Sequence, residues 1–232
     1  MASQVKSRQR VQDHGEVFTN EREVNAMLDM VKQETERIES RFLEPACGDG
    51  NFLAEVLRCK LAVVNARYRR SISEYEKYAF IAVGSIYGVE LLHDNTVTCR
   101  ERLFSIAESD YLRVCRKNPT PGFLDAIRYV LERNILNGNA LSLKQVDENG
   151  ADTEEPIIFS EWSIVTGDKV KRRDFRLDEM LEGSAEQVQF SLFGSSGTPT
   201  SEWEFDEETD AMIPKPIWEY PMVSFYEVQN DE

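Results

Sequence analysis

The stretch FLEPACGDGNFL, residues 42–53, leaves the backbone few ways to fold. Apolar residues close both of its ends, and two glycines, Gly48 and Gly50, lie between them. Glycine adopts left-handed backbone conformations that other residues avoid, and it lets a ligand come close to the main chain. We therefore predict a short strand, then a sharp turn with exposed backbone N–H groups, and then a helix capped by Asn51.

This turn has two interpretations. A tight connection between any strand and helix explains the glycines without a ligand. A ligand-binding turn is the alternative. Its spacing is not GxGxxG, and no Lys-Ser or Lys-Thr follows, which excludes a phosphate-binding P-loop. The neighbouring acids Glu44 and Asp49 favour a ligand that carries an ammonium group and sugar hydroxyls over a pyrophosphate.

Helices and strands are predicted to alternate along the first 150 residues. Apolar residues recur at helical spacing at residues 21–40, 51–68, 93–117 and 123–134, with an extra helical segment at 66–78. Apolar runs predict strands at 41–45, 79–91 and 135–141, of which the second is buried and ends near Glu90. Asp94 or Asn95 is the predicted cap of the long helix. This alternation is typical of an α/β fold with a parallel sheet covered by helices.

The remaining residues, 151–232, form a different, β-rich part. Strands are predicted at residues 155–165, 187–194 and 222–228, and a helix only at 176–181. This part carries 6 basic and 20 acidic side chains, whereas residues 1–150 carry 21 and 22. The net charge of −15 therefore belongs to the C-terminal part, and the N-terminal part can still present a basic face. We predict an acidic loop near residues 194–211 and a solvated turn at the basic run 168–175. The alternatives are that the acidic loop imitates a DNA phosphate track or occupies a basic groove on a partner, and that the basic run contacts phosphates.

Composition argues against several classes of protein. No run of eighteen apolar residues occurs, so a membrane span is not expected. The basic N-terminus is not followed by the apolar segment of a secretory signal. The four cysteines form no CxxC pair and only two histidines occur, which argues against a zinc site. We expect a cytoplasmic protein with reduced thiols and no bound metal.

Four segments resemble, in the family's order, motifs of the S-adenosylmethionine-dependent DNA methyltransferases that modify adenine N6. EPACGDGNFL resembles motif I, and the upstream GEVFTNEREVNAML resembles motif X. IYGVEL resembles motif II, a strand that ends in an acid, and NGNAL resembles motif III. The resemblance covers residues 14–143. It implies a Rossmann-like class I methyltransferase fold with a mostly parallel sheet, with the cofactor-binding core in residues 1–150 and residues 151–232 completing the sheet.

The resemblance assigns eight positions to the S-adenosylmethionine site. Two would lie beside the methionine part, and four would face its amino and carboxylate groups. One acid would accept both ribose hydroxyls with its two oxygens, and one amide would pair with the adenine edge. In this order, the positions are Phe18 and Thr19; Glu44 and the backbone of Ala46, Gly48 and Gly50; Glu90; and Asn139.

The sequence departs from the family pattern most clearly at the catalytic motif, Asn/Asp-Pro-Pro-Tyr/Phe. In the family, its polar groups and aromatic ring hold the extruded adenine. NPTP at residues 118–121 lies between motifs II and III, where a turn explains it, and IPKPIWEYP at 213–221 lacks the asparagine. In the expected region stand Ser160, Glu161 and Trp162, which offer an acceptor and a ring without the prolines. These three are the remaining catalytic candidates.

Two functions stay open from the sequence. The first is an adenine-N6 DNA methyltransferase, divergent or one half of a split enzyme, that transfers the methyl group without a metal. The second is a binding or regulatory subunit that keeps the fold and the cofactor but needs a partner chain, in a modification or restriction system. The order of the motifs favours the first function, and the missing catalytic motif favours the second for the isolated chain.

Overall fold

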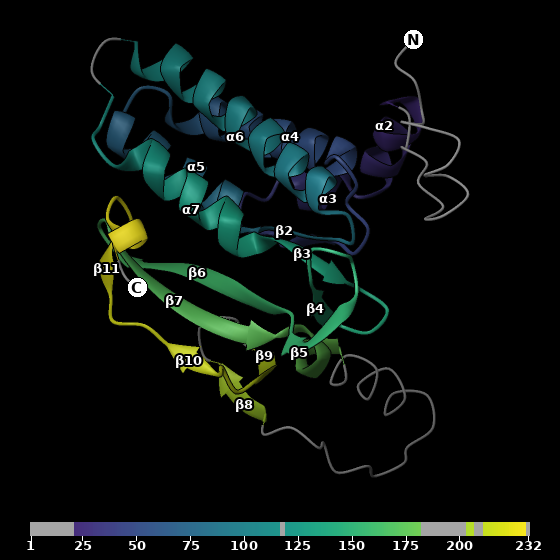
Figure 1. Cartoon of the computed structure of the whole chain (residues 1–232). Coiled ribbons are helices and arrows are strands. Elements are labelled where there is room, and N and C mark those ends of the chain that lie inside the picture. Colours follow the sequence, from purple (N-terminus) through teal and green to yellow (C-terminus); the bar gives the residue numbers. More distant parts are fainter. Residues whose placement is uncertain (1–20, 117–118, 182–202, 207–210, 231–232) are drawn as a thin grey trace.

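The structure, a computed structural model, describes residues 21–116, 119–181, 203–206 and 211–230 (Figure 1). The helices are α2 (Glu21–Met30), α3 (Lys32–Thr35), α4 (Asn51–Tyr68), α5 (Ile72–Gly84), α6 (His93–Cys115), α7 (Phe123–Asn134) and the short 3₁₀ helix η1 (Val228–Asn230). The strands are β1 (Phe42–Glu44), β2 (Ile86–Glu90), β3 (Ile135–Asn139), β4 (Lys144–Val146), β5 (Asp152–Pro156), β6 (Ile158–Thr166), β7 (Lys169–Arg176), β8 (Trp203–Asp206), β9 (Ala211–Pro214), β10 (Trp218–Glu219) and β11 (Val223–Ser224).

The first sheet has five strands in the order β1-β2-β3-β4-β5. β1, β2 and β3 pair in parallel, and β4 and β5 follow in antiparallel pairing, so the sheet is mixed. Helices α4 and α5 connect β1 to β2, and α6 and α7 connect β2 to β3. This arrangement confirms the predicted α/β class. It also brings the carboxyl ends of the three parallel strands to one edge of the sheet, the edge where ligands bind in open α/β sheets.

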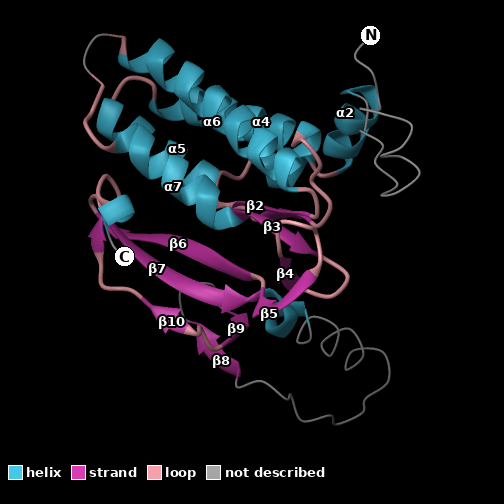
Figure 2. Ribbon diagram, in the orientation of Figure 1, coloured by secondary structure: helices cyan, strands magenta, loops and turns pink. Residues whose placement is uncertain are grey.

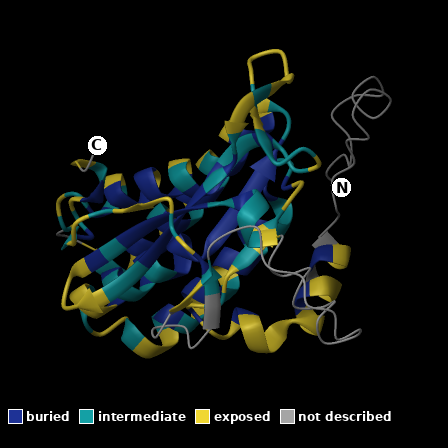
Figure 3. Cartoon of the chain, turned by 90° about the horizontal axis from the view of Figure 1, so that it is seen from below, coloured by how far each residue is buried: buried dark blue, intermediate teal, exposed yellow. Residues whose placement is uncertain are grey.

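Side chains alternate across the first sheet and separate two cores. Ile86 belongs to the main core beneath helices α4 to α7, whereas the next residue, Tyr87, belongs to a smaller core on the opposite face. There the Tyr87 ring packs edge-on against Phe159 of β6, with centroids 5.2 Å apart. Helices therefore cover one face and the start of β6 covers the other, and buried residues run through the middle of the molecule (Figure 3).

β6 and β7 form a long antiparallel hairpin in a second sheet. β10 and β11 pair with the other edge of β7 at its two ends, so β7 is the central strand. Helices α4 to α7 lie on one side of both sheets (Figure 2), and α5 and α7 contact β6. The basic run 168–175 was predicted to be a solvated turn. That prediction is wrong, because the run lies in β7 and its Arg172 and Arg173 are buried.

Two other predictions near β2 are wrong. Residues 79–84 form the end of α5, and only Ile86–Glu90 is a strand. The end of α5 is buried among α4, α7 and β6, so it is apolar on nearly every side and loses the periodicity that marks a surface helix. Leu92 occupies the N-cap position of α6, so neither Asp94 nor Asn95 caps this helix.

The C-terminal part contributes to three sheets. β5 joins the first sheet, whereas β6, β7, β10 and β11 form the second. Within the predicted acidic loop near 194–211, residues Trp203–Asp206 are instead strand β8, which pairs with β9 in a third, two-stranded sheet. Most of the remaining loop and the predicted strand at 187–194 lie outside the described residues.

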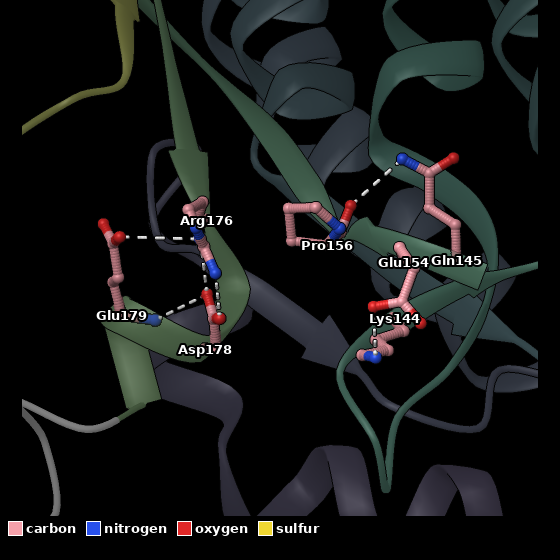
Figure 4. Close-up of polar contacts among 7 residues, drawn as sticks. All are labelled: Lys144, Gln145, Glu154, Pro156, Arg176, Asp178 and Glu179. Atoms are coloured by element: carbon pink, nitrogen blue, oxygen red, sulfur yellow. Dashed lines mark hydrogen bonds and ion pairs between the residues drawn. The ribbon is translucent and has the colours of Figure 1, made fainter. Parts of the chain in front are cut away.

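Polar contacts hold the β4–β5 hairpin and the helical turn at 177–181 that follows β7 (Figure 4). Lys144 Nζ lies 3.4 Å from Glu154 Oε2 across the hairpin. Arg176 Nη2 lies 2.6 Å from Asp178 Oδ2, at the start of the helical turn. Because these side chains are partly or fully exposed, each pair is worth no more than about 1 kcal/mol and chiefly favours the local geometry.

Lys60 of α4 is buried and holds the segment that precedes β1. Its Nζ donates to the carbonyls of Arg37 at 3.3 Å, Ile38 at 2.8 Å and Ser40 at 2.5 Å. Burial lowers the pKa of Lys60 to about 7. One buried amine thus satisfies three carbonyls and fixes where the chain enters the sheet.

Candidate functional site

The predicted turn lies at the carboxyl end of β1 and leads directly into α4. Gly48 and Gly50 both have positive φ angles, 54° and 86°. Cys47 ties the turn to the sheet, because its N–H donates to Val89 O at 3.0 Å and its carbonyl accepts from Gly50 N at 2.8 Å. Gly50 occupies the N-cap position, so the prediction of Asn51 as the cap is wrong and Asn51 is the first helical residue.

Glu90 meets this turn from the end of the neighbouring strand. Its Oε2 accepts from the Gly48 N–H at 2.8 Å. Its Oε1 accepts from the Leu92 N–H at 3.0 Å and from Asn95 Nδ2 at 3.3 Å. Glu90 is only 8% exposed, so these donors replace the water that a buried carboxylate loses. Two of the predicted site residues, Gly48 and Glu90, are therefore in direct contact.

Gly50 is required by packing as well as by its backbone conformation. A Cβ at Gly50 would lie 2.7 Å from Cys99 Sγ of α6, a distance that real Cβ atoms essentially never show. On β2, a Cβ at Gly88 would lie 2.9 Å from Cys47 Sγ. A hydrogen bond with Cys99 and burial raise the pKa of the Cys47 thiol well above its ordinary value. Gly50 therefore faces α6, whereas the half-buried Gly48 faces Glu90.

Arg102 of α6 is a site residue that the sequence did not indicate. Its Nη2 lies 2.8 Å from Asp49 Oδ2, and its Nη1 also donates to Asn51 Oδ1. Asp49 thus anchors the turn to α6. The two ion-pair partners are 53 residues apart, so no local pattern marks Arg102 and only the fold brings it to the turn.

The structure separates the roles of two asparagines on β3. Asn137 is the register partner of Glu90, and its Nδ2 donates to the carbonyls of Glu90 at 2.8 Å and Leu91 at 2.9 Å. Asn139, the predicted adenine partner, donates from Nδ2 to Asp152 Oδ1 at 2.9 Å, and its Oδ1 accepts a backbone N–H two residues on. Its amide therefore stabilises the chain after β3, and Asn137 contacts the strand end that carries Glu90. Both asparagines share one face of the strand, so sequence alternation could not choose between them.

The other predicted cofactor residues lie at the start of the turn or outside the described residues. Glu44 ends β1 and is half-buried, and burial raises the pKa of its carboxyl above its ordinary value. Ala46 is exposed in the turn. Phe18 and Thr19 lie outside the described residues.

The catalytic candidates Ser160, Glu161 and Trp162 lie on β6 and alternate between its two faces. Ser160 and Trp162 face the helices. Ser160 Oγ donates to Asp174 Oδ1 at 2.7 Å. Trp162 is 7% exposed, and its ring packs edge-on against Phe80 of α5, with centroids 5.8 Å apart. Both side chains are therefore part of the interface between the second sheet and the helices.

A buried polar network surrounds Ser160. The Arg172 guanidinium donates to both carboxylate oxygens of Asp174, at 3.0 and 2.9 Å, and to the Tyr129 hydroxyl of α7 at 2.7 Å. The Tyr220 hydroxyl donates to Asp174 at 3.1 Å, and the Tyr220 ring lies 4.0 Å from the guanidinium carbon. Both charges are thus paired and hydrogen-bonded, as buried charges must be.

Glu161 points to the opposite face of β6, where Arg41 and Arg173 both pair with it. This trio lies beside a cavity of about 130 Å³ between the two sheets, whose other lining residues are apolar or aromatic. They are Leu43, Tyr87, Phe159, Phe175, Leu177, Met180, Ile213 and Pro214. Glu161 therefore does not share a site with Ser160 and Trp162.

Within the described ranges, no group of three or more His, Cys, Asp or Glu side chains is placed to hold a metal ion. None of the helices in those same ranges combines the length and apolar character needed to cross a bilayer. Comparison of the chain with protein-family models, with curated proteins and with solved structures finds no match.

Proposed function

We propose that this chain has a Rossmann-like methyltransferase core that binds S-adenosylmethionine at the carboxyl ends of β1 to β3. The observation that carries the proposal is the contact between the Gly48 N–H and the Glu90 carboxylate, at 2.8 Å. It joins a glycine turn and an acid from adjacent parallel strands, at the edge of the sheet where ligands bind in open α/β folds. The order of the four sequence motifs supports the same site.

The hydrogen bonds of Glu90 set a condition on ribose binding. A carboxylate offers about four lone-pair sites. The Gly48 N–H, the Leu92 N–H and the Asn95 amide already donate to three of these sites on Glu90. Within the described part of the chain, these contacts leave one lone pair for a ribose hydroxyl, so a second hydroxyl must replace a donor. The Gly48 N–H is the donor to exchange, because it belongs to a half-buried turn while the other two belong to the start of α6. On this condition, the residues present fit a ribose.

The other residues of the turn would bind and orient the rest of the ligand. Ala46 is exposed, and its backbone would face the carboxylate of the ligand, while the half-buried Glu44 would receive the ammonium group. A cation there would counteract the burial that raises the pKa of Glu44. When bound, S-adenosylmethionine supplies a methyl group that its sulfonium polarises, so transfer to a nitrogen requires no metal.

We propose further that transfer to adenine in DNA requires a partner chain. Extruding a base costs a few kcal/mol, which must be offset by hydrogen-bond acceptors and a stacking ring. Ser160 and Trp162 are engaged on one side of β6, and Glu161 on the other. This arrangement supports a cofactor-binding subunit of a cytoplasmic modification system over a complete adenine-N6 methyltransferase.

A methyl-transfer assay tests this proposal. The full chain is incubated with methyl-labelled S-adenosylmethionine and either duplex or single-stranded DNA. We expect cofactor binding without transfer above the protein-free control, and robust transfer by the chain alone would favour the complete enzyme. In that case, Glu161→Gln is the informative variant. Trp162→Ala would cost about 3–5 kcal/mol of stability by emptying a core position, so its loss of activity would not identify a catalytic ring.

A further inference from the structure

A groove of about 840 Å³ runs between α4 and α6 on the helical side of the protein. Its lining includes four arginines, Arg58 and Arg69 from α4 and its C-cap, and Arg102 and Arg113 from α6. The two arginines on each helix are eleven residues apart in the sequence, which corresponds to about three helical turns and about 16 Å along the helix axis. Eleven residues return to nearly the same helix face, so each pair marks the two ends of one side of the groove.

Helices α4 and α6 pack side by side (Figure 1), and two contacts between them show that they run in the same direction. Asn51 at the start of α4 contacts Arg102, and Asn65 Nδ2, nearly four turns later, donates to Asp110 Oδ2 at 2.5 Å. Arg102 therefore lies at the end near the turn after β1, and Arg69 and Arg113 lie at the far end. We call this surface, with Arg58, the arginine groove.

Small and polar side chains line the arginine groove between its guanidinium groups. Ser105 and Ser109 of α6 are exposed, and their hydroxyls make no hydrogen bond within the described part of the chain. Ala62 and Ala66 of α4 are also exposed and leave room above the helix. Arginine, serine and asparagine side chains are among the usual contacts of nucleic-acid phosphates.

The guanidinium groups at the far end of the groove keep donors for a ligand, whereas Arg58 pairs with Glu55 and Arg102 pairs with Asp49. Arg69 is exposed and has no ion-pair partner among the described residues. The Arg113 side chain is 71% exposed and pairs through one nitrogen with Asp110. That carboxylate also accepts from Asn65 and, at 2.8 Å, from the Tyr75 hydroxyl. Because a guanidinium has five N–H donors, these contacts leave several for an anion.

Further arginines extend the positive charge at the far end of the groove. Arg67, Arg70 and Arg116 follow at the ends of the same two helices, and all three are exposed. The chain as a whole has a net charge of −15, so this cluster stands out against an acidic protein. A local basic face of this kind attracts polyanions even when the net charge is negative.

We propose that the arginine groove binds the phosphate backbone of one nucleic-acid strand. Packed helix axes are about 8–10 Å apart, a width that suits one backbone and not a whole duplex. A length of about 16 Å corresponds to about five phosphates of one strand at about 3.4 Å each. The proposal does not depend on cofactor binding, although Arg102 connects the groove to the turn after β1.

Fluorescence anisotropy on the full chain without cofactor tests this proposal. The probes are labelled 20-nucleotide single-stranded DNA, duplex DNA and RNA, titrated at several salt concentrations. Four phosphate contacts predict a slope of log K against log salt of about −3 for a single strand. We expect Arg69→Gln/Arg113→Gln to weaken binding at least tenfold and to reduce this slope by about 1–2. The probe with the highest affinity then shows which kind of nucleic acid supplies the bound strand.

The matched control is Arg128→Gln. Arg128 of α7 is also exposed and ion-paired, to Glu101 at 2.9 Å, but it lies outside the groove. The affinity of the Arg128→Gln variant for the nucleic-acid probe should therefore stay within twofold of wild type. Equal weakening by both variants, or no saturable binding at 50 mM salt, would overturn the proposal. Displacement by poly-glutamate as effectively as by unlabelled nucleic acid would also overturn it and assign the groove to an acidic protein. Thermal unfolding checks the fold, and Arg69→Gln alone breaks no ion pair among the described residues.

Discussion

Gly50→Ala separates the conformational and packing requirements of the turn after β1. The backbone φ of Gly50 is 86°, and a left-handed conformation costs an L-residue about 1–2 kcal/mol. The added Cβ would also lie 2.7 Å from Cys99 Sγ and 3.3 Å from Cys99 Cβ. Overpacking of a filled core adds about 1–3 kcal/mol. We therefore expect Gly50→Ala to lower the free energy of unfolding by about 2–5 kcal/mol, as measured by urea denaturation.

Gly150→Ala is the matched control, because Gly150 has a φ of 77° and its added Cβ would meet nothing within 4 Å. It should show only the conformational cost of about 1–2 kcal/mol. Cys99→Ala removes the nearest atom, so the double variant Gly50→Ala/Cys99→Ala should be more stable than additivity predicts, by about 1 kcal/mol. Equal losses in Gly50→Ala and Gly150→Ala, together with additive behaviour of the double variant, would refute the packing argument.

Three other predictions follow from buried charges and from the groove. Lys60 has an ordinary pKa of 10.5 and a folded pKa of about 7, so the unfolded chain binds more protons between these values. The stability of wild type relative to Lys60→Met should therefore rise from pH 7 toward 10, and a pH-independent difference in urea titrations would contradict this. Asp174→Asn leaves the buried Arg172 guanidinium without a carboxylate and should lower the free energy of unfolding by about 3–5 kcal/mol. Arg128→Gln breaks only an exposed ion pair and should lower it by less than about 1 kcal/mol. Equal urea-denaturation midpoints of the two variants would refute this expectation. Neither Arg69→Gln nor Arg128→Gln should change the affinity for S-adenosylmethionine in calorimetry, since neither residue contacts the turn after β1; a tenfold loss in either would contradict this placement of the site.

Sequence reasoning predicted the parts of the fold whose patterns are local. The strand before Gly48, the helices on both sides of β2 and the strand that ends at Glu90 each follow from apolar spacing and turn residues. The start of that strand was placed too early because residues 79–84 are apolar on nearly every side, and such a run does not distinguish a buried helix from a strand.

Contacts between distant segments could not be predicted in the same way. Arg172 and Arg173 have the composition of a solvated turn, and only pairing with Asp174 and Glu161 in a central strand allows their burial. Arg102 likewise acquires a role because α6 packs beside the turn that carries Asp49. At the candidate site, Gly48 and Glu90 lie 42 residues apart in the sequence and contact each other only through the pairing of β1 with β2, and the partners of Asn137 and Asn139 likewise depend on strand register.

Calorimetric titration of the full chain with S-adenosylmethionine tests the central claim most directly. A site formed by the turn after β1 and Glu90 predicts micromolar-range binding, on the order of −7 to −8 kcal/mol. Glu90→Gln should weaken binding by about 1.5–3 kcal/mol through loss of a charged acceptor, whereas Glu101→Gln, on the exposed side of α6, should leave it unchanged. Absence of heat and of any thermal shift with saturating S-adenosylmethionine, or equal affinity in wild type and Glu90→Gln, would contradict the account.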